Sequence, residues 1–267
     1  MTENDDLEEE KVPITEFGDI WALGEHRLMC GSSTDVDNVQ SLMDGRKADL
    51  LLTDPPYNIG YEGKTEEHLT IENDLMQEQE FTDFLIAAFS AVAAVLNAGA
   101  AFYIWYASTT TFSFVSACRA AGLDVRAYLV WIKNRATLSR GDYNWRHEPC
   151  LYGWMPGKSH RWRGGHKQST VLFFDSPAAS REHPTMKPVP MFQQLIENST
   201  RPGDLVLDLF CGSGTTIEAA ERSKRICYAM ELDPHYCDVI VRRWEKLTGR
   251  KAELIRGETN GRTAAAD

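Results

Sequence analysis

Short, almost continuously apolar runs recur along the chain, with longer amphipathic stretches between them. Residues 26–31, 48–54 and 100–106 are runs of this kind, which is typical of strands buried on both faces of a parallel sheet. Between the last two, residues 80–97 carry apolar side chains at helical spacing, and Gly99 supplies a stop signal soon after. The first half of the chain is therefore predicted to alternate strands with helices.

The same alternation returns towards the carboxyl terminus. Asp233 followed by Pro234 has the form of a helix N-cap and a first helical position, and apolar side chains follow at helical spacing. Such alternation predicts an α/β fold, most simply a doubly wound, largely parallel sheet. The further elements expected are strands at 125–133, 204–209 and 225–231, and helices at 189–200 and directly after Gly214.

Residues 134–182 interrupt this alternation with a long stretch rich in Gly, Trp, Arg and His. Long irregular segments in compact domains are usually functional or disordered, and the interleaved aromatic residues argue against disorder. The charge is also distinctive, because residues 131–187 hold ten basic and four acidic side chains in a protein of net charge −11. A local basic segment in an acidic protein predicts a binding site for a polyanion.

The composition excludes several classes of protein. A chain of 267 residues, 43% of them apolar, is long enough to bury a sizeable core. No apolar stretch reaches the roughly 18 residues of a membrane span, and the acidic start is unlike a signal peptide. Six scattered cysteines without a CxxC pair predict reduced thiols in a cytoplasmic protein, not a metal site. Residues 1–12 are expected to be a disordered acidic tail, and residues 257–267 a flexible one.

A glycine turn and a later carboxylate suggest a nucleoside-containing cofactor. Residues 208–215, with the sequence DLFCGSGT, end a predicted strand with a turn whose glycines let the backbone approach a ligand. Glu231 ends the next predicted strand, at the distance along the chain where a carboxylate accepts hydrogen bonds from ribose hydroxyls. Ile217 stands where the dinucleotide motif has its third glycine, which argues against a nicotinamide-dependent dehydrogenase.

A rigid turn with a carboxylate follows another predicted strand. Residues 54–57 read DPPY and come directly after the apolar run that begins at residue 48. Two prolines cannot extend the hydrogen-bonding ladder of a sheet, so the turn is rigid. The sequence therefore predicts that Asp54 and Tyr57 face the carboxyl edge of the sheet, where ligands bind in open α/β folds.

Taken in order, these motifs resemble those of the S-adenosylmethionine-dependent DNA amino-methyltransferases. The DPPY motif comes first, followed by the basic segment, residues 183–188 (HPTMKP) and the glycine turn, as in the circularly permuted beta group of that family. The resemblance covers roughly residues 17–250. It implies a Rossmann-like methyltransferase sheet with a catalytic half at 13–133, an inserted target-recognition segment at 134–182 and a cofactor-binding half at 183–256.

The resemblance further implies that S-adenosylmethionine is the cofactor and lies against the glycine turn, with Glu231 holding its ribose. Thr185 and Lys187 would approach the cofactor carboxylate. Ser32 stands where the family commonly has the Asp that contacts the cofactor adenine, so Ser32 or Asp35 is expected to take that role. The expected cofactor-binding residues are Ser32, Thr185, Lys187, Asp208, Phe210, Gly212, Ser213, Gly214, Thr215 and Glu231.

For the reaction, the resemblance makes DPPY the catalytic motif, that is Asp54, Pro55, Pro56 and Tyr57. Asp54 and the Pro55 carbonyl would accept hydrogens from the exocyclic amino group of a flipped base, on which Tyr57 would stack. His147 and Glu148 are interpreted as internal framework of the basic segment, without a catalytic role. Contacts to DNA are expected from Arg146, Lys158, His160, Arg161, Arg163 and Lys167.

Asp rather than Ser at the head of the DPPY motif favours N6 of adenine as the target, so a site-specific adenine methyltransferase is the main hypothesis. N4 of cytosine is the close alternative. A catalytically inactive homologue that binds DNA or the cofactor is an alternative of another class. The partners expected are DNA, S-adenosylmethionine and, because similar enzymes often dimerise, a second copy of the chain. No membrane and no metal are expected.

Overall fold

The computed structural model describes residues 12–59, 76–137, 142–177 and 186–255. A short 3₁₀ turn at Ser108–Thr110 precedes one of its helices. In chain order the elements are β1 (Ile20–Leu23), β2 (His26–Cys30), α1 (Val36–Met43), β3 (Ala48–Thr53), α2 (Glu78–Val95), β4 (Leu96–Trp105), α3 (Thr111–Ala120), β5 (Asp124–Thr137), β6 (Trp145–Trp154), β7 (Val171–Phe173), α4 (Val189–Ser199), β8 (Leu205–Asp208), α5 (Thr215–Arg222), β9 (Ile226–Glu231), α6 (Pro234–Thr248) and β10 (Glu253–Ile255).

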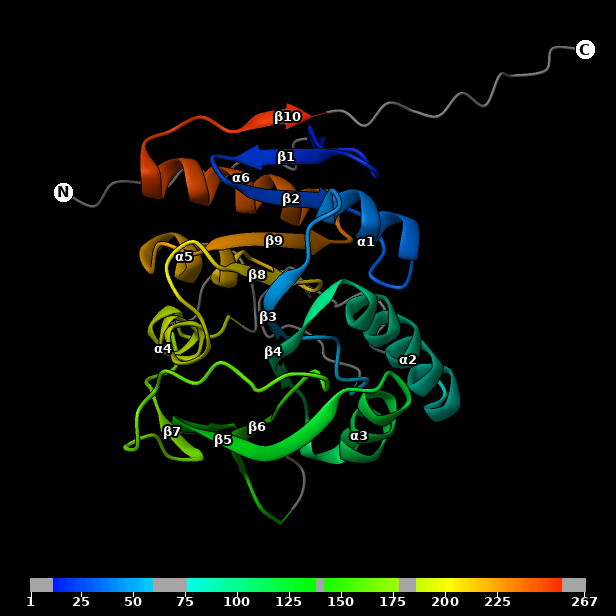
Figure 1. The fold of residues 1–267 in the computed structure, drawn as a ribbon, viewed down its shortest axis with the longest axis vertical. Helices are drawn as coiled ribbons and strands as arrows, with labels where there is room; N and C mark the ends of the chain where they lie inside the picture. The colour runs from blue at the N-terminus through cyan, green and yellow to red at the C-terminus, as the bar shows by residue number, and fades with distance from the viewer. Residues whose placement is uncertain (1–11, 60–75, 138–141, 178–185, 256–267) are drawn as a thin grey trace, which may run out of the picture.

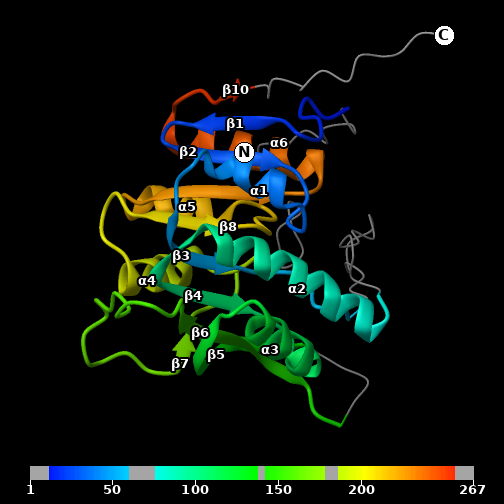
Figure 2. The same ribbon diagram turned by 45° about the vertical axis from the view of Figure 1, so that its right-hand side comes forward.

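The strands form one ten-stranded sheet in the order β10-β1-β2-β9-β8-β3-β4-β6-β5-β7 (Figure 2). Of these described strands, β1 and β6 run antiparallel to their neighbours and the others share one direction. This confirms the prediction of an α/β fold with a doubly wound, largely parallel sheet.

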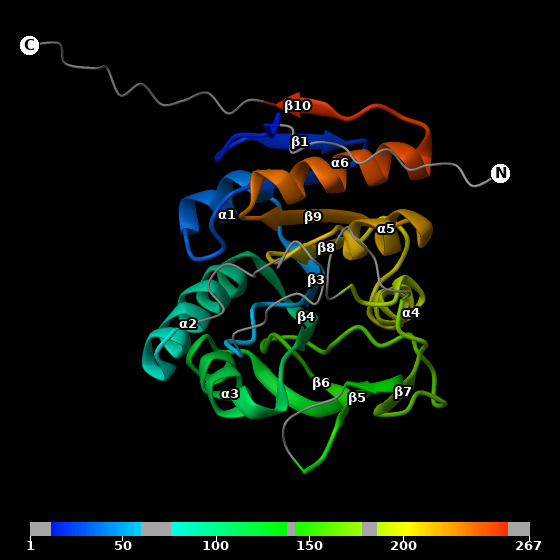
Figure 3. The same ribbon diagram turned by 180° about the vertical axis from the view of Figure 1, so that it is seen from behind.

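The helices cover both faces of the sheet (Figure 1, Figure 3). On one face, α1, α2 and α3 pack with Leu51 and Phe102, and on the other, α4, α5 and α6 pack with Leu50, Leu52 and Trp105. Successive leucines of β3 thus enter opposite cores. Because both of its faces are buried, β3 has no polar alternation and reads as a continuous apolar run.

The structure corrects one expectation, since residues 134–182 are not irregular throughout. Within them, β6 lies inside the sheet and pairs antiparallel with β4 on one side and β5 on the other. Pro149 and Gly153 resemble loop residues in the sequence, but both are buried within this strand. A Cβ atom at Gly153 would lie 2.6 Å from the ring of Phe102, so the glycine permits close approach of neighbouring strands.

The centre of the sheet is where the winding changes direction. β8 and β3 pair in parallel, with Leu50 opposite Val206 and Leu51 opposite Leu207. From β8 the chain passes through α5 to β9, whereas from β3 it passes through α2 to β4 on the other side. The carboxyl ends of β8 and β3 therefore meet at a topological switch point, the usual ligand position in open α/β sheets.

Several predictions can be placed only partly. The predicted tails, 1–12 and 257–267, lie outside the described residues except for Val12. Thr185 of the HPTMKP motif also lies outside them. In the described residues, no helix is both long and apolar enough to cross a membrane. The same part of the chain contains no cluster of three or more His, Cys, Asp or Glu side chains suited to a metal ion. All six cysteines are free and buried.

Candidate active site

The DPPY motif forms the turn directly after β3, at the switch point. Asp54 follows Thr53, the last residue of the strand, and Pro55 is buried beneath the turn. The Tyr57 hydroxyl donates a hydrogen bond to Asp54 Oδ1 over 2.5 Å. The ring of Tyr57 meets Phe114 of α3 edge-on, with 6.4 Å between ring centroids. The structure therefore brings the DPPY motif to the carboxyl edge and fixes the orientation of its carboxylate.

Lys187 reaches this carboxylate from the turn before α4. Its side chain is only 4% exposed, and its Nζ lies 2.5 Å from Asp54 Oδ2 and 3.2 Å from the Tyr57 hydroxyl. The ammonium also lies over the rings of Tyr57 and Trp105, 5.4 and 5.9 Å from their centroids. The sequence assigned Lys187 to the cofactor carboxylate, whereas the structure places it on Asp54.

Glu148 is a site residue that the sequence reasoning missed. It lies on β6, and its Oε2 is 3.1 Å from Lys187 Nζ, while its Oε1 pairs with Lys133 of β5. Asp54, Glu148, Lys187 and Lys133 thus form a cluster of two carboxylates and two ammonium groups. The sequence offered one signal for Glu148, which is that it is an acidic residue within the basic segment.

Burial and pairing shift the ionisation of this cluster in different directions. Burial raises the pKa of Asp54 above its usual value, although the Lys187 ammonium opposes that shift. Burial also acts to raise the pKa of Glu148, but Lys187 and Lys133 outweigh it and leave that pKa lowered. For Lys187, burial acts to lower the pKa, and Asp54 and Glu148 together raise it. The Lys187 ammonium is therefore charged and held between two carboxylates.

Asp208 joins the glycine turn to β3, the strand that the DPPY motif follows. It is the last residue of β8 and only 2% exposed, and it accepts hydrogen bonds from Thr53 Oγ1 at 2.8 Å and Thr216 Oγ1 at 2.5 Å. The amide of Phe210 donates to the same carboxylate over 3.1 Å. Burial raises the pKa of Asp208 to about 6. This carboxylate therefore fixes the turn relative to the residue that precedes Asp54.

The glycine turn and Glu231 meet at the ends of β8 and β9. Gly212 and Gly214 have φ values of 53° and 89°, and a Cβ atom on Gly214 would lie 3.2 Å from Ile240 of α6. The Gly212 amide donates to Glu231 Oε2 over 2.7 Å, and the amides of Leu232 and Asp233 donate to Oε1. Burial raises the pKa of Glu231 to about 7. A half-buried carboxylate beside a glycine turn fits the hydroxyls of a ribose.

The remaining predicted cofactor residues lie around this turn. Ser213 and Thr215 are buried within it, and Phe210 packs edge-on against Phe84 of α2, 6.0 Å between centroids. Ser32 follows Gly31, whose amide donates to the carbonyl of Glu231 over 2.9 Å, so Ser32 lies beside the same strand end.

Of the two residues expected to replace the family's Asp, Asp35 already has another role. Its carboxylate caps α1 by accepting hydrogen bonds from the amides of Asp37 and Asn38 and from the Asn38 side chain. The Ser32 hydroxyl is 2.9 Å from Thr34 Oγ1, and hydroxyls can donate and accept at once. Ser32 is therefore the better placed of the two.

The predicted DNA-binding residues lie at opposite ends of the strands, some at the carboxyl ends of the parallel strands and others at the amino ends. Arg146 is the second residue of β6, at the same edge as the DPPY motif, and its Nε donates to the Lys133 carbonyl over 3.2 Å. Lys158, His160, Arg161 and Arg163 follow the other end of β6, and Lys167 lies exposed on the way to β7.

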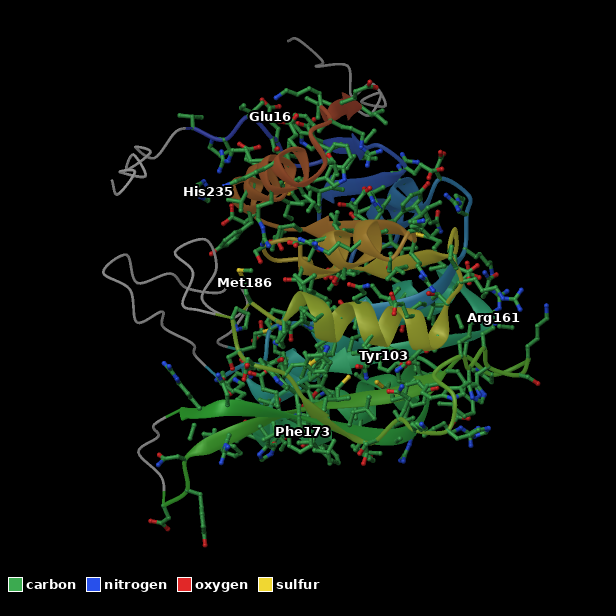
Figure 4. The ribbon with its side chains drawn as sticks, turned by 90° about the vertical axis from the view of Figure 1, so that its left-hand side faces the viewer. Glu16, Tyr103, Arg161, Phe173, Met186 and His235 are labelled. Atoms are coloured by element: carbon green, nitrogen blue, oxygen red, sulfur yellow. The ribbon has the colours of Figure 1, made fainter. Side chains whose placement is uncertain are left out.

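Arg161 shows the position of this second group clearly. It pairs with Asp49 at 3.0 Å and with Asp204 at 3.6 Å, near the amino ends of β3 and β8. In Figure 4, Arg161 and Met186, the neighbour of Lys187, lie on opposite sides of the molecule. DNA contact by the second group thus stays a prediction, and these residues do not adjoin the DPPY motif.

Comparison with known proteins assigns the chain to a family. A family model described as DNA methylase matches residues 48–242, well over half of the chain. YubD of Escherichia coli (strain K12), which carries the name methylase, is 32% identical over 203 residues, or 76% of this chain and 84% of that protein. YhdJ of the same organism, named DNA adenine methyltransferase, is 26% identical over 243 residues, covering 78% and 79% of the two chains.

Solved structures share the fold. The complex of M1.HpyAVI with SAM aligns with a TM-score of 0.64 and 20% identity over 81% of this chain and 97% of that one. The PvuII DNA methyltransferase, described as cytosine-N4-specific, aligns with a TM-score of 0.64 and 18% identity over 83% and 89%. The family model and the identity to YubD show that the chain belongs to the family of S-adenosylmethionine-dependent DNA amino-methyltransferases.

Proposed function

We propose that this protein transfers a methyl group from S-adenosylmethionine to the exocyclic N6 amino group of an adenine flipped out of DNA. The observation that carries the proposal is the Asp54 carboxylate, held by Tyr57 and Lys187 at the switch point beside the glycine turn. The relative YhdJ is named an adenine methyltransferase and supports the choice of base. The PvuII enzyme, a cytosine-N4 methyltransferase by its name, keeps N4 of cytosine as the second candidate.

The chemistry of the amino group explains why a fixed carboxylate is needed. Its lone pair is delocalised into the base ring, so the nitrogen is a poor nucleophile. Where Asp54 and the Pro55 carbonyl each accept one amino hydrogen, the lone pair localises on nitrogen and can attack a methyl group. The same acceptors stabilise the positive charge that develops on the nitrogen. Tyr57 supplies an aromatic surface for a base taken out of the stack.

The cofactor supplies an electrophilic methyl group bonded to a sulfonium. The residues that would hold it are the backbone of the glycine turn around Gly212 and Gly214, the Glu231 carboxylate and Ser32. Their chemistry fits an amino acid joined to a nucleoside, because Glu231 offers a carboxylate acceptor, Ser32 offers a hydroxyl, and the glycines let the backbone lie close to a ligand. Asp208 would act indirectly, since its carboxylate is already bonded to Thr53 and Thr216.

DNA must approach the catalytic edge, because Asp54 has to reach the target base. The β5–β6 hairpin carries basic and aromatic side chains to this edge, among them Lys133, Arg135, Tyr143, Trp145 and Arg146. Arg135, Tyr143, Trp145 and Arg146 are exposed. Basic side chains beside exposed aromatic rings suit phosphate contacts together with stacking.

Replacing Arg135 and Arg146 together with Gln is expected to weaken DNA binding about tenfold. The plot of log K against log salt has a negative slope, and each lost phosphate contact reduces the magnitude of that slope by about 0.9. Losing two contacts should therefore make the slope shallower by about 2. Fluorescence anisotropy over a series of salt concentrations measures both quantities. The matched control replaces Arg161 and Arg163 with Gln, and loss of binding there instead would place the DNA along the other edge.

Mass spectrometry of the nucleosides released from treated DNA tests the proposal directly. Purified protein is incubated with S-adenosylmethionine and unmodified duplex DNA, which is then digested. N6-methyladenine is the expected product, and N4-methylcytosine would correct the base while keeping the mechanism. If folded protein binds DNA and cofactor but yields neither product, the chain is an inactive binding homologue and the proposed reaction is wrong.

A further inference from the structure

Lys187 takes up the acceptor that the target amino group needs. Two of the three ammonium hydrogens are used, in bonds to Asp54 Oδ2 at 2.5 Å and to the Tyr57 hydroxyl at 3.2 Å. The ammonium also lies over the Tyr57 ring, the surface on which a flipped base would stack. The amino group of a base and the Lys187 ammonium would therefore compete for the same carboxylate.

Glu148 offers this ammonium a second place to bind. Its Oε2 is 3.1 Å from Lys187 Nζ, close enough for an ion pair. Glu148 Oε2 is inaccessible to solvent, and among the described residues it has no partner in hydrogen-bond geometry. The Lys187 ammonium has a third hydrogen to give, and a small movement away from Asp54 would bring that hydrogen into line. An inaccessible acceptor thus lies beside an ammonium that competes with the amino group for Asp54.

We propose that Glu148 is a positioning residue that retains the Lys187 ammonium when the target amino group takes its place on Asp54. The inference rests on the proposed function, since it assumes that an amino group binds Asp54. Without Glu148, a displaced Lys187 would be a buried cation with no counter-charge, which is strongly unfavourable. With Glu148, the exchange leaves both ammonium groups, Lys187 and Lys133, beside a carboxylate, while Asp54 accepts hydrogen bonds from Tyr57 and the amino group.

A purely structural role for Glu148 makes a different prediction. If Glu148 only joined β6 to β5 through Lys133, its loss would have the same effect whether or not Lys187 is present. If it retains Lys187, its loss matters only while Lys187 competes for Asp54. A double-mutant cycle on Glu148 and Lys187 therefore separates the two roles.

The experiment measures base flipping by Glu148→Gln, Lys187→Met and the double variant. The target site is first located by sequencing DNA methylated by the unaltered enzyme, and 2-aminopurine is placed beside the target base to report its departure from the stack. S-adenosylhomocysteine is raised until the signal saturates, so that changes in cofactor affinity do not contribute. Glu245→Gln serves as control, because Glu245 of α6 pairs with Lys251 away from the site and is 22% exposed against 19% for Glu148.

We expect Glu148→Gln to lower the equilibrium constant for base flipping at least tenfold when Lys187 is present. In the Lys187→Met background, the same substitution should lower it less than twofold. Glu245→Gln should change neither value. Equal losses in both backgrounds, or no loss in either, would overturn the proposal. If Glu148→Gln does not fold, Glu148→Asp replaces it and should show a smaller loss with the same dependence on Lys187. Absence of methylation by the unaltered enzyme would refute the proposed function itself, which is a separate outcome.

Discussion

Replacing Asp54 with alanine should lower turnover by about 10²–10³-fold while S-adenosylmethionine still binds. The substitution removes the acceptor that localises the lone pair of the amino group, and the loss of one such fixed group typically costs about 10²–10³-fold in rate. Lys187 keeps Glu148 as a partner, so no unpaired cation is left and the protein should fold. Single-turnover methylation and equilibrium binding of the cofactor measure the two effects separately.

Asp49 provides a matched control for this prediction. It lies near the amino end of β3, the strand that Asp54 follows, and its side chain is similarly buried, 15% exposed against 21%. Asp49→Ala should reduce stability, because its carboxylate binds the Leu205 amide, and leave the turnover of folded protein unchanged. Asp54→Asn keeps one carbonyl acceptor and should retain measurable activity. Turnover by Asp54→Ala at the unaltered rate would refute the mechanism.

Replacing Glu231 with alanine should weaken S-adenosylmethionine binding about 100-fold. Hydrogen bonds to charged groups are each worth about 1.5–3 kcal/mol, and two ribose hydroxyls would lose their acceptor. The Gly212 amide would also lose its acceptor, so the turn would be less well ordered. Isothermal titration calorimetry measures the affinity, with thermal unfolding as the check that the variant folds. An unchanged affinity would show that the ribose is held elsewhere.

The pH dependence of the same binding has a defined sign. Burial raises the pKa of Glu231 to about 7, so the carboxyl group is largely protonated in the free protein below that pH. Only the ionised form offers all of its lone pairs to hydroxyl donors. Affinity should therefore rise as pH increases through about 7, and Glu231→Gln should remove the change between pH 6.5 and 8. Asp208, with a pKa of about 6, titrates below this window.

The parts of the fold predicted correctly are those where the local sequence and the buried environment agree. β2, β3, β4, β8 and β9 read as continuous apolar runs because both faces of the sheet are covered. Asp233 and Pro234 begin α6 as their residue types predict, with Asp233 accepting a hydrogen bond from the His235 amide. The order of the motifs was enough to place the DPPY turn and the glycine turn at one edge.

The parts that were missed depend on contacts between distant segments. β6 contains Pro149 and Gly153, which normally indicate a loop, and only its position between β4 and β5 makes them suitable. Glu148 reaches Lys187 because of the register of that strand, which the sequence does not show. Basic composition likewise predicts a polyanion site without indicating an edge, so Arg161, which pairs with Asp49, was grouped with Arg146.

The pairing of β3 with β8 has a consequence for how the chain acquires its structure. The Thr53 and Asp208 side chains that bond at this junction are 155 residues apart in sequence. During synthesis the apolar β3 therefore has an open edge until most of the protein has left the ribosome, and pairing of such high contact order is slow. A chain that stops before residue 205 would keep that edge exposed to other chains, a known route to aggregation.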